Sequence, residues 1–365
     1  MGQEDQVRYF KECSSPNFES PLGNLTQGVN FPICMAPMVG LSHIGLRAVA
    51  REYLPEGAVT IWPSEMLNSR RVPHENLEET PAAMKLEDES VWIPQILGNE
   101  EVAIRKSVEK LLSYGAKGID INMGCPVKKA LRHNYGVALL GDPDYAAQVV
   151  KMAKIDTQIP VSVKLRVGEQ KDWGSMVKFV KGLEASGADW LTFHPRTSAQ
   201  KRRGRADWGQ IQKLKEILSI PLIGNGDVQT VEDALSMIEQ CEVDMVMVGR
   251  AMTVRPWILW QFGEHLGWPN PPGKSGRAPR TPIEEGKEYG VFLKKVLKVM
   301  EENFSESYAI RKFQFLVRTG APWLKFGQFL FSKVTLAKSI EQTEKALEDF
   351  FSSPQEMIQK TELRQ

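Results

Sequence analysis

The sequence has few cysteines, and the four that it has are far apart. Cys13, Cys34, Cys125 and Cys241 form no C-x-x-C pair, so their spacing gives no sign of a zinc site, an iron–sulfur cluster or a redox pair. We therefore expect no metal and a reducing, cytoplasmic setting. The N-terminal region lacks a basic start followed by an apolar run, and no stretch approaches the ~18 apolar residues of a membrane span. We expect no membrane association.

Net charge is almost absent as well, because 46 lysines and arginines oppose 45 aspartates and glutamates. This balance excludes a protein that binds nucleic acid over its whole surface, although an average can hide local basic patches. The 365 residues are 42% hydrophobic and 25% charged, as in ordinary well-packed proteins. At this length we expect one large domain of about 250 residues with a smaller partner, in a monomeric protein.

Eight short apolar runs, separated by amphipathic helical patterns, predict eight strands. The clearest helical pattern begins at Asn99, a good N-cap residue, and ends before Gly115. Apolar strands that are each followed by a helix are typical of a parallel sheet, and eight such units predict a (βα)8 TIM barrel. A doubly wound open sheet is the alternative, and both folds place their chemistry at the carboxyl ends of the strands. The predicted strands are 31–35, 58–62, 91–97, 118–122, 160–165, 190–194, 221–224 and 245–249.

The composition changes after the last strand. A segment with four prolines and three cations predicts an exposed linker. After it, Thr281-Pro282-Ile283-Glu284 combines an N-cap threonine, a proline at the first helical position and an acid at the third, which is typical of a helix start. We therefore expect a C-terminal helical bundle. The predicted parts are an N-terminal extension (1–30), the barrel (31–266), the linker (267–280) and the helical domain (281–365).

Polar residues or glycines follow nearly every predicted strand. Singly they are weak indications, because glycine also serves tight turns. Lys164 and His194 are stronger, since an apolar strand rarely ends in such a residue without a partner for its charge. Barrels commonly bind phosphate after strands seven and eight, where Gly226, Gly249 and Arg250 lie. With a cation and an imidazole nearer the barrel axis, the pattern predicts an FMN site.

Cys125 lies just past the fourth predicted strand, between Gly124 and Pro126 and three residues after Asn122. An inert buried thiol is the commoner state of a cysteine. The position at a strand end, inside a turn that glycine and proline shape, favours instead a proton donor or a nucleophile. The residues alone leave these alternatives open.

Taken together, these motifs resemble those of the flavin-dependent tRNA-dihydrouridine synthases, in particular the bacterial type. The resemblance covers about residues 31–352. It implies an FMN-binding barrel with an RNA-binding helical domain, NADPH as electron source, and reduction of the C5–C6 bond of a uracil in folded tRNA. The motifs are Ala36-Pro37-Met38, Ser64-Glu65-Met66, Gly118 to Pro126, Lys164-Leu165-Arg166, His194-Pro195-Arg196-Thr197, Ala206-Asp207-Trp208, Gly224-Asn225-Gly226-Asp227 and Gly249-Arg250.

The resemblance also implies a role for each matching residue. Cys125 would donate the proton to C5 of uracil, so its thiol should be slightly acidic but largely protonated at neutral pH. Asn122, Arg166 and Arg196 would contact the extruded nucleotide. The residues that would contact FMN are Ala36, Pro37, Met38, Gln95, Lys164, His194, Asn225, Gly226, Asp227, Gly249 and Arg250.

A uracil that leaves its stack in folded RNA needs compensating contacts elsewhere, and local basic clusters could supply them. Residues 311–338 hold six cations and no acid, which indicates an electrostatic contact surface. We interpret most of the aromatic residues among them as core. Basic residues also follow the fourth and sixth strands and occupy the linker. The RNA-binding candidates are Lys128, Lys129, Arg311, Lys312 and Arg318.

Two other functions remain open. A dihydroorotate-type FMN dehydrogenase acting on free pyrimidines would share the barrel but would have no use for a basic helical domain. A non-catalytic RNA-binding chaperone would not need Cys125, Lys164, His194 and Arg250.

Overall fold

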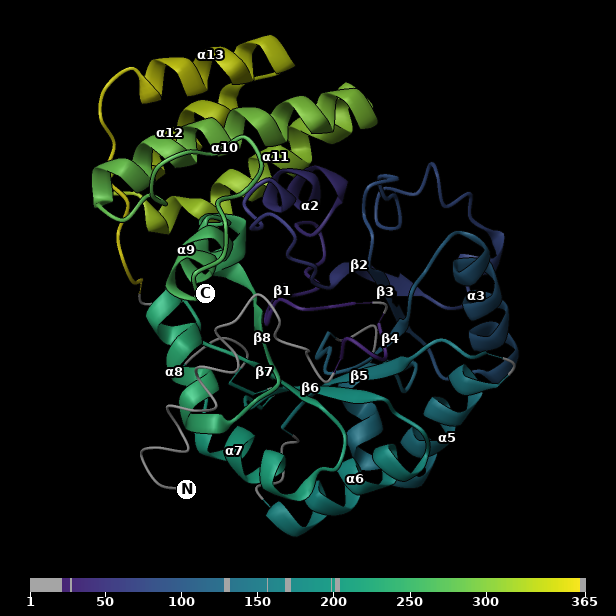
Figure 1. Ribbon diagram of the computed structural model, residues 1–365. Coiled ribbons are helices and arrows are strands. Elements are labelled where there is room, and N and C mark those ends of the chain that lie inside the picture. The colour runs from purple at the N-terminus through teal and green to yellow at the C-terminus, as the bar shows by residue number, and fades with distance from the viewer. Residues whose placement is uncertain are drawn as a thin grey trace.

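The barrel is a single eight-stranded parallel sheet whose strands follow the order β1-β8-β7-β6-β5-β4-β3-β2 (Figure 1). The computed structural model describes residues 22–26, 28–127, 132–155, 157–167, 172–197, 199–200 and 204–361. Helices alternate with the strands and surround the sheet, which confirms the predicted TIM barrel. The strands are β1 (Ile33–Met35), β2 (Trp62–Asn68), β3 (Trp92–Leu97), β4 (Ile119–Met123), β5 (Val161–Arg166), β6 (Trp190–His194), β7 (Leu222–Asn225) and β8 (Met245–Val248).

The helices fall into a barrel set and a C-terminal set. None of the helices in the described ranges is both long enough and apolar enough to cross a membrane. The barrel set is α2 (Ile44–Arg51), α3 (Glu101–Ser113), α5 (Pro143–Lys154), α6 (Trp173–Ala185), α7 (Trp208–Ile217), α8 (Val231–Cys241) and α9 (Ile258–His265), with short 3₁₀ turns η1 (Val72–His74), η2 (Gly136–Gly141) and η3 (Arg250–Thr253). The C-terminal set is α10 (Pro282–Asn303), α11 (Glu306–Gly320), α12 (Gly327–Leu336) and α13 (Ile340–Phe351), with the turn η4 (Ala321–Trp323).

The second strand lies further along the chain than predicted. The predicted strand 58–62 meets β2 only at Trp62, whereas the other seven predicted strands agree with the structure within two residues. Pro63 has no N–H for a ladder, and the pairing of β2 with β3 shifts register between Pro63 and Met66. This bulge absorbs the proline, so Ser64 and Glu65 lie within the strand instead of after it.

Bonds outside the ladders bring together the two ends of the sheet, β1 and β2. The backbone N–H groups of Asn30 and Phe31 both donate to the carbonyl of Val59 at 3.0 Å. The Thr60 hydroxyl donates to the carbonyl of Ile33 at 2.6 Å. The barrel is therefore closed at this seam by contacts of the segment that precedes β2.

Helix caps account for several of the element boundaries. The run Thr230-Val231-Glu232-Asp233 predicts a capping box at the start of α8, as the run from Thr281 does for α10. Both capping boxes form, each as a reciprocal bond between the threonine and the acid three residues later. Asn99 does not cap α3, whose N-cap is Glu100. The Asn99 amide instead donates to the carbonyls of His133 and Asn134, because the loop after β4 passes beside it.

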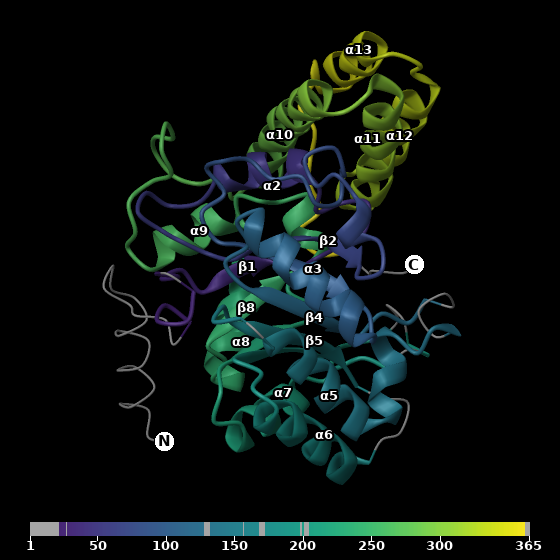
Figure 2. The same cartoon turned by 90° about the vertical axis from the view of Figure 1, so that its right-hand side faces the viewer.

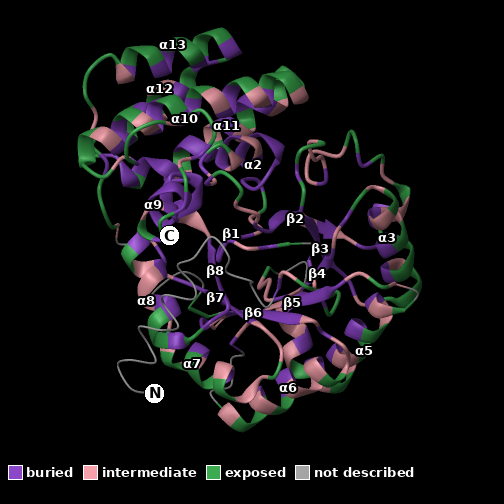
Figure 3. Ribbon diagram, viewed as in Figure 1, coloured by how far each residue is buried: buried purple, intermediate pink, exposed green. Residues whose placement is uncertain are grey.

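Buried residues fill the strands, whereas exposed residues lie on the outer faces of the helices (Figure 3). All residues of β7 and β8 are buried, as expected for parallel strands that are covered on both sides. The C-terminal helices stack on the side of the barrel that carries α2 and α9 (Figure 2). The sequence predicts an apolar side of α10 with Tyr289, Phe292, Val296 and Val299. The first three are fully buried, and Val299 is half-buried.

The segment 267–280 is fastened to its surroundings by ion pairs. Its cations Lys274, Arg277 and Arg280 pair with Glu288, Glu284 and Glu264 at 2.7, 2.8 and 3.0 Å. The sequence predicts that these linker cations add to an RNA-binding surface. Carboxylates of the same protein partly neutralise them, because the segment runs back along α9 and α10.

Arg255 joins the barrel to the C-terminal part of the chain. Its guanidinium pairs with Glu285 of α10 at 2.8 Å, and both side chains are buried. The same group donates to the carbonyls of Gln229, Ile358 and Gln359 at 3.0–3.1 Å. One buried cation therefore links a barrel loop, α10 and the segment after α13.

Replacing Arg255 by Ala should lower the free energy of unfolding by about 3 kcal/mol, because Glu285 would remain buried without its partner. Denaturant unfolding monitored by circular dichroism measures the change. Arg277→Ala is the matched control, since its ion pair with Glu284 is exposed and screened by solvent, and its loss should change the free energy of unfolding far less. Equal losses in the two variants would contradict this view of Arg255.

Candidate active site at the carboxyl ends of the strands

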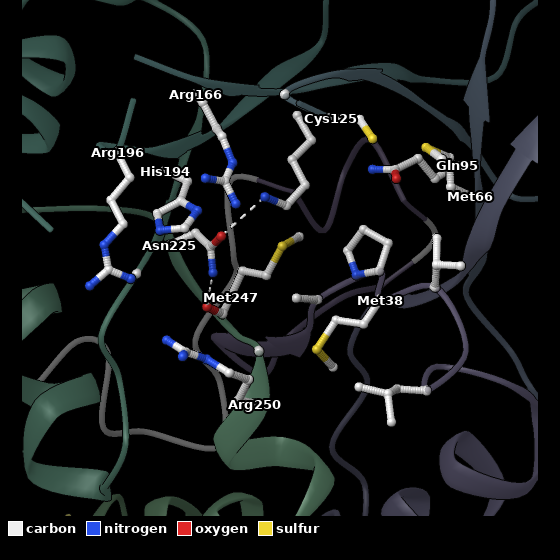
Figure 4. Close-up of a pocket in the computed structure, with 18 of the residues that line it drawn as sticks. Met38, Met66, Gln95, Cys125, Arg166, His194, Arg196, Asn225, Met247 and Arg250 are labelled. Carbon is white, nitrogen blue, oxygen red and sulfur yellow. Dashed lines mark hydrogen bonds between the residues drawn. The ribbon is translucent and has the colours of Figure 1, made fainter. Parts of the chain in front are cut away.

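The carboxyl ends of the strands surround a cavity of about 740 Å³. Figure 4 shows Arg166, His194, Arg196 and Arg250 on one side of this cavity, and Gln95, Met66 and Cys125 on the other. The cavity lining includes these residues predicted from the sequence: Ala36, Pro37, Met38, Gln95, Asn122, Cys125, Lys164, Arg166, His194, Arg196, Asn225, Gly226, Asp227, Gly249, Arg250 and Arg318.

Four of the five predicted RNA-binding residues are not seen at the cavity. Arg311 and Lys312 lie on α11, which also carries Arg318, but they are not part of the cavity lining. Lys128 and Lys129 lie outside the residues that the structure describes.

The turn that carries Cys125 is held by Asn122. The Asn122 side-chain oxygen accepts the backbone N–H groups of Gly124 at 3.1 Å and of Cys125 at 2.9 Å. Gly136 packs against the other side of the turn with a φ of +59°, and a Cβ there would lie 2.7 Å from the Cys125 carbonyl oxygen. The close approach therefore requires glycine at this position.

The Cys125 thiol keeps its proton at neutral pH. Burial raises the pKa of Cys125 above its ordinary value, against the opposing effects of a backbone hydrogen bond from Val127 and the positive charge of Arg166. The expectation of a largely protonated thiol agrees with this direction. The expectation of a slightly acidic thiol does not, because desolvation outweighs the nearby cation.

Lys164 lies on β5 and is oriented by Asn225. Its ammonium donates to the Asn225 side-chain oxygen at 3.1 Å, and the Asn225 amide donates to the carbonyl of Met247 at 2.7 Å. Desolvation first, and the positive charge of Arg166 second, lower the pKa of Lys164 to about 8, against the opposing negative charge of Asp120. Lys164 is therefore charged at neutral pH but is easily deprotonated.

His194, at the end of β6, is neutral. Desolvation and the surrounding cations, Lys164 first among them, hold the pKa of His194 well below its usual value. Its Nε2 atom is buried and has no hydrogen-bond partner among the described residues. Gly226 packs against the ring, where a Cβ would lie 2.9 Å from its Cδ2 atom. The imidazole is therefore fixed in place with one nitrogen available to a ligand.

Arg196 and Asp227 pair with each other. The Arg196 guanidinium donates to both carboxylate oxygens at 2.7 and 2.8 Å, and the Asp227 carboxylate also accepts the Ala206 N–H at 2.6 Å. The Arg196 side chain is only 2% exposed. The resemblance implies that Arg196 contacts a nucleotide and that Asp227 contacts FMN. Their two charges instead compensate each other across the neighbouring ends of β6 and β7.

The C-terminal helices contribute part of the cavity wall. Phe315, Arg318 and Thr319 of α11 line it, and only Arg318 was expected there.

The aromatic residues of this region divide into two groups. Phe313 and Trp323 are buried, as interpreted from the sequence, whereas Phe315, Phe326 and Phe329 are 39%, 63% and 59% exposed. The interpretation as core is wrong for these three. Phe315 lies on the side of α11 that faces the cavity. Phe326 and Phe329 follow the break at 320–323, where α12 begins anew and does not continue the apolar period of α11.

Sequence reasoning missed two other groups at this site. Met66, which was predicted only as part of a motif and without a role, and Met247 line the cavity, but a methionine in an apolar strand gives no signal of its own. Asp120 lies directly below the lining, where its carboxylate accepts bonds from Ser162 and Gln95. An acidic residue inside the apolar run 118–122 was the available signal for it.

Comparison with known proteins agrees with this geometry. Residues 34–319 match the family model "Dihydrouridine synthase (Dus)". A probable tRNA-dihydrouridine synthase of Rhizobium leguminosarum bv. phaseoli is 34% identical over 225 residues, which are 62% of this chain and 69% of the relative. The tRNA-dihydrouridine synthase B of Pseudomonas aeruginosa is 34% identical over 241 residues, 64% of this chain and 71% of the relative.

A probable tRNA-dihydrouridine synthase 1 of Synechocystis sp. is 32% identical over 246 residues, which are 67% of each chain. Because the family model spans most of the barrel and reaches the end of α11, this chain belongs to the dihydrouridine synthase family, a family of oxidoreductases.

Proposed function

We propose that this protein reduces the C5–C6 double bond of specific uridines in tRNA to 5,6-dihydrouridine, with FMN as cofactor and NADPH as electron donor. The observation that carries the proposal is a protonated thiol, Cys125, in the same cavity as a set of cations and a neutral imidazole. The relatives, which are named as tRNA-dihydrouridine synthases, support it. A monomer that acts in the cytoplasm is part of the same proposal.

The residues of the cavity fit FMN. The buried Nε2 atom of His194 has no partner among the described residues, and Lys164 supplies a positive charge beside it. A Cβ at Gly249 would meet only Met38 and Ala36, at 3.8 and 3.9 Å, so the backbone there is accessible to a phosphate. The residues proposed to hold FMN are Ala36, Pro37, Met38, Gln95, Lys164, His194, Asn225, Gly226, Gly249 and Arg250, with Asp227 acting through Arg196.

Cys125 is proposed to protonate C5 of the uracil. When bound and reduced by NADPH, FMN supplies the hydride that C6 receives. The Cys125 Sγ atom holds its proton until C5 gains negative character, and the positive charge of Arg166 favours the thiolate that remains. Solvent then returns a proton to the thiolate. One hydride and one proton together saturate the C5–C6 bond.

Asn122 and Arg166 are proposed to orient the uracil. The Asn122 amide donates one N–H to Gln95 at 2.8 Å, and its second N–H can donate to a uracil carbonyl. Because the same residue holds the Cys125 turn, it would couple the position of the base to that of the thiol. Arg196 is proposed to act on the nucleotide only indirectly, through the segment 204–206, which Arg196 contacts at the Gly204 carbonyl and Asp227 contacts at the Ala206 N–H.

The helical part of the chain, residues 281–361 of those described, is proposed to bind tRNA. Arg311 and Arg318 are exposed on α11, and Arg318 also reaches the cavity lining. Lys312 lies between them on the same helix, and Lys128 and Lys129 remain predicted contacts. Phosphate contacts at α11 would orient the RNA and so select the uridine that enters the cavity.

Cys125→Ala should bind FMN and tRNA normally but form dihydrouridine about 100- to 10,000-fold more slowly, which is the usual effect of losing a general acid. Single-turnover assays with the reduced enzyme measure the rate. Cys241→Ala is the control, because this buried thiol lies on α8 outside the cavity, and it should keep its activity. A wild-type rate in Cys125→Ala would exclude the proposed role.

FMN affinity should fall as the pH rises above about 8, because Lys164 then loses the charge that favours an electron-rich ligand. Fluorescence titration of the FMN-free protein measures this affinity. At pH 7, Lys164→Met should bind FMN about tenfold more weakly, a loss of about 1.4 kcal/mol. The variant should also lack the fall in affinity around pH 8, and a variant that kept it would assign that fall to another group.

Reversing charge on α11, with Arg311→Glu and Arg318→Glu together, should weaken tRNA binding about tenfold and reduce its salt dependence by roughly one to two counterions. Filter binding at several salt concentrations gives both quantities. Lys178→Glu is the control, because it changes an exposed cation on α6, at the opposite side of the barrel (Figure 1). Equal effects of the two changes would mean that α11 is not the docking surface.

A further inference from the structure

Asp120 is a buried carboxylate in the middle of β4 that the proposed reaction does not use. It is 6% exposed and does not belong to the cavity lining. The strand register places it directly between Gln95 of β3 and Ser162 of β5. A buried acid inside a barrel is costly unless its charge is well satisfied, so its presence requires an explanation.

Both oxygens of Asp120 accept strong hydrogen bonds. The Ser162 hydroxyl donates to one oxygen at 2.6 Å and the Gln95 amide donates to the other at 2.7 Å. Burial has the largest effect and raises the pKa of Asp120 above its ordinary value, while these two bonds and the positive charge of Lys164 oppose that rise. The geometry places both carboxylate oxygens as acceptors, with Lys164 as the cation that compensates the charge of the ionised form.

From Asp120 a chain of hydrogen bonds runs to the backbone of Cys125. The Gln95 side-chain oxygen accepts from the Asn122 amide at 2.8 Å. The Asn122 side-chain oxygen in turn accepts the N–H groups of Gly124 and Cys125. Every link runs in the same direction, with each amide donating toward Asp120 and accepting from the side of the thiol.

The charge at Asp120 can set this direction. An ionised carboxylate has no proton to donate, so Gln95 must turn its NH₂ group toward Asp120 and its oxygen toward Asn122. Asn122 must then donate to Gln95 and turn its own oxygen toward the Cys125 turn. In the reverse orientation an NH₂ group would face two backbone N–H groups, and the turn would lose both bonds.

We propose that Asp120 is a positioning residue whose carboxylate, which accepts a hydrogen bond at each oxygen, orients the Gln95 and Asn122 amides and thereby holds the Cys125 thiol in place. The inference rests on the proposed role of Cys125 as proton donor. It assigns to Asp120 no contact with the substrate.

Asp120→Asn tests this, because an asparagine can present either an oxygen or an NH₂ group to Gln95. With the orientation no longer imposed, the turn should loosen, and the thiol should become more exposed and ionise more readily. Alkylation of Cys125 by iodoacetamide at pH 7.5 should then be about threefold faster or more, and its rate–pH curve should shift to lower pH. Mass spectrometry of the Cys125 peptide from the full-length protein follows this cysteine alone.

Ser64→Ala is the matched control. Ser64 is also fully buried and contacts the same residue, but its hydroxyl accepts the backbone N–H of Gln95, at 3.1 Å. This bond does not depend on the orientation of the Gln95 amide. The alkylation rate of Cys125 in Ser64→Ala should match that of the wild type. An increase equal to that in Asp120→Asn would mean that any change in the packing around Gln95 has this effect, and it would overturn the proposal.

Gln95→Leu cuts the same chain at its next link and serves if Asp120→Asn does not fold. It should raise the alkylation rate in the same way, and the double variant should be no faster than Gln95→Leu alone. Wild-type alkylation in either folded single variant would overturn the proposal.

A kinetic measurement separates this inference from the proposed function. In Asp120→Asn the kcat for tRNA should fall about tenfold with an unchanged KM, because a misplaced donor affects the chemical step. A fall in kcat with unchanged alkylation would overturn the positioning role. If the wild-type protein forms no dihydrouridine, the proposed function fails, while faster alkylation in Asp120→Asn would still support the orienting role of Asp120.

Discussion

The active site depends on the burial of polar groups between neighbouring strands of the barrel. Parallel pairing places Gln95, Asp120 and Ser162 side by side, and it places Asn122 beside Lys164 in the next inward-facing layer. Groups buried in this way lose their water and must find partners within the protein. The hydrogen bonds among them satisfy this requirement and fix the side chains that reach the cavity.

The same desolvation gives the cavity its two chemical sides. It lowers the pKa of Lys164 and His194 and raises that of Cys125. One side of the cavity therefore presents cations and a neutral imidazole, which suit an anionic, electron-rich ligand. The other side presents a protonated thiol. The proposed reaction needs both sides, because one would bind the hydride donor and the other would hold the proton. The thiol must stay protonated although cations lie in the same cavity.

The C-terminal helices complete the site because they are fixed to the barrel. Arg255 and Glu285 form a buried pair that joins α10 to the loop after β8, and α10 packs along α2. This arrangement brings α11 to the cavity, where Phe315 and Arg318 form part of the wall. The proposed RNA-binding helix and the proposed catalytic turn are thus parts of one structure, which lets contacts with the RNA influence the position of the base.

Sequence patterns by themselves determined the barrel, seven of its strands, two capping motifs and most of the cavity lining. They could do so because apolar period, caps and strand ends are local properties of the chain. The start of β2 was misplaced because a bulge that accommodates Pro63 is a property of a strand pair.

Only the tertiary structure decided the partners. It paired Arg196 with Asp227, engaged the linker cations with carboxylates, exposed Phe326 and Phe329, and placed Asp120 beneath the Cys125 turn. It also decided the state of the thiol, because burial outweighs the neighbouring cation only in the folded protein. Partners, exposure and desolvation arise between segments far apart in the chain, and no local pattern of residues specifies them.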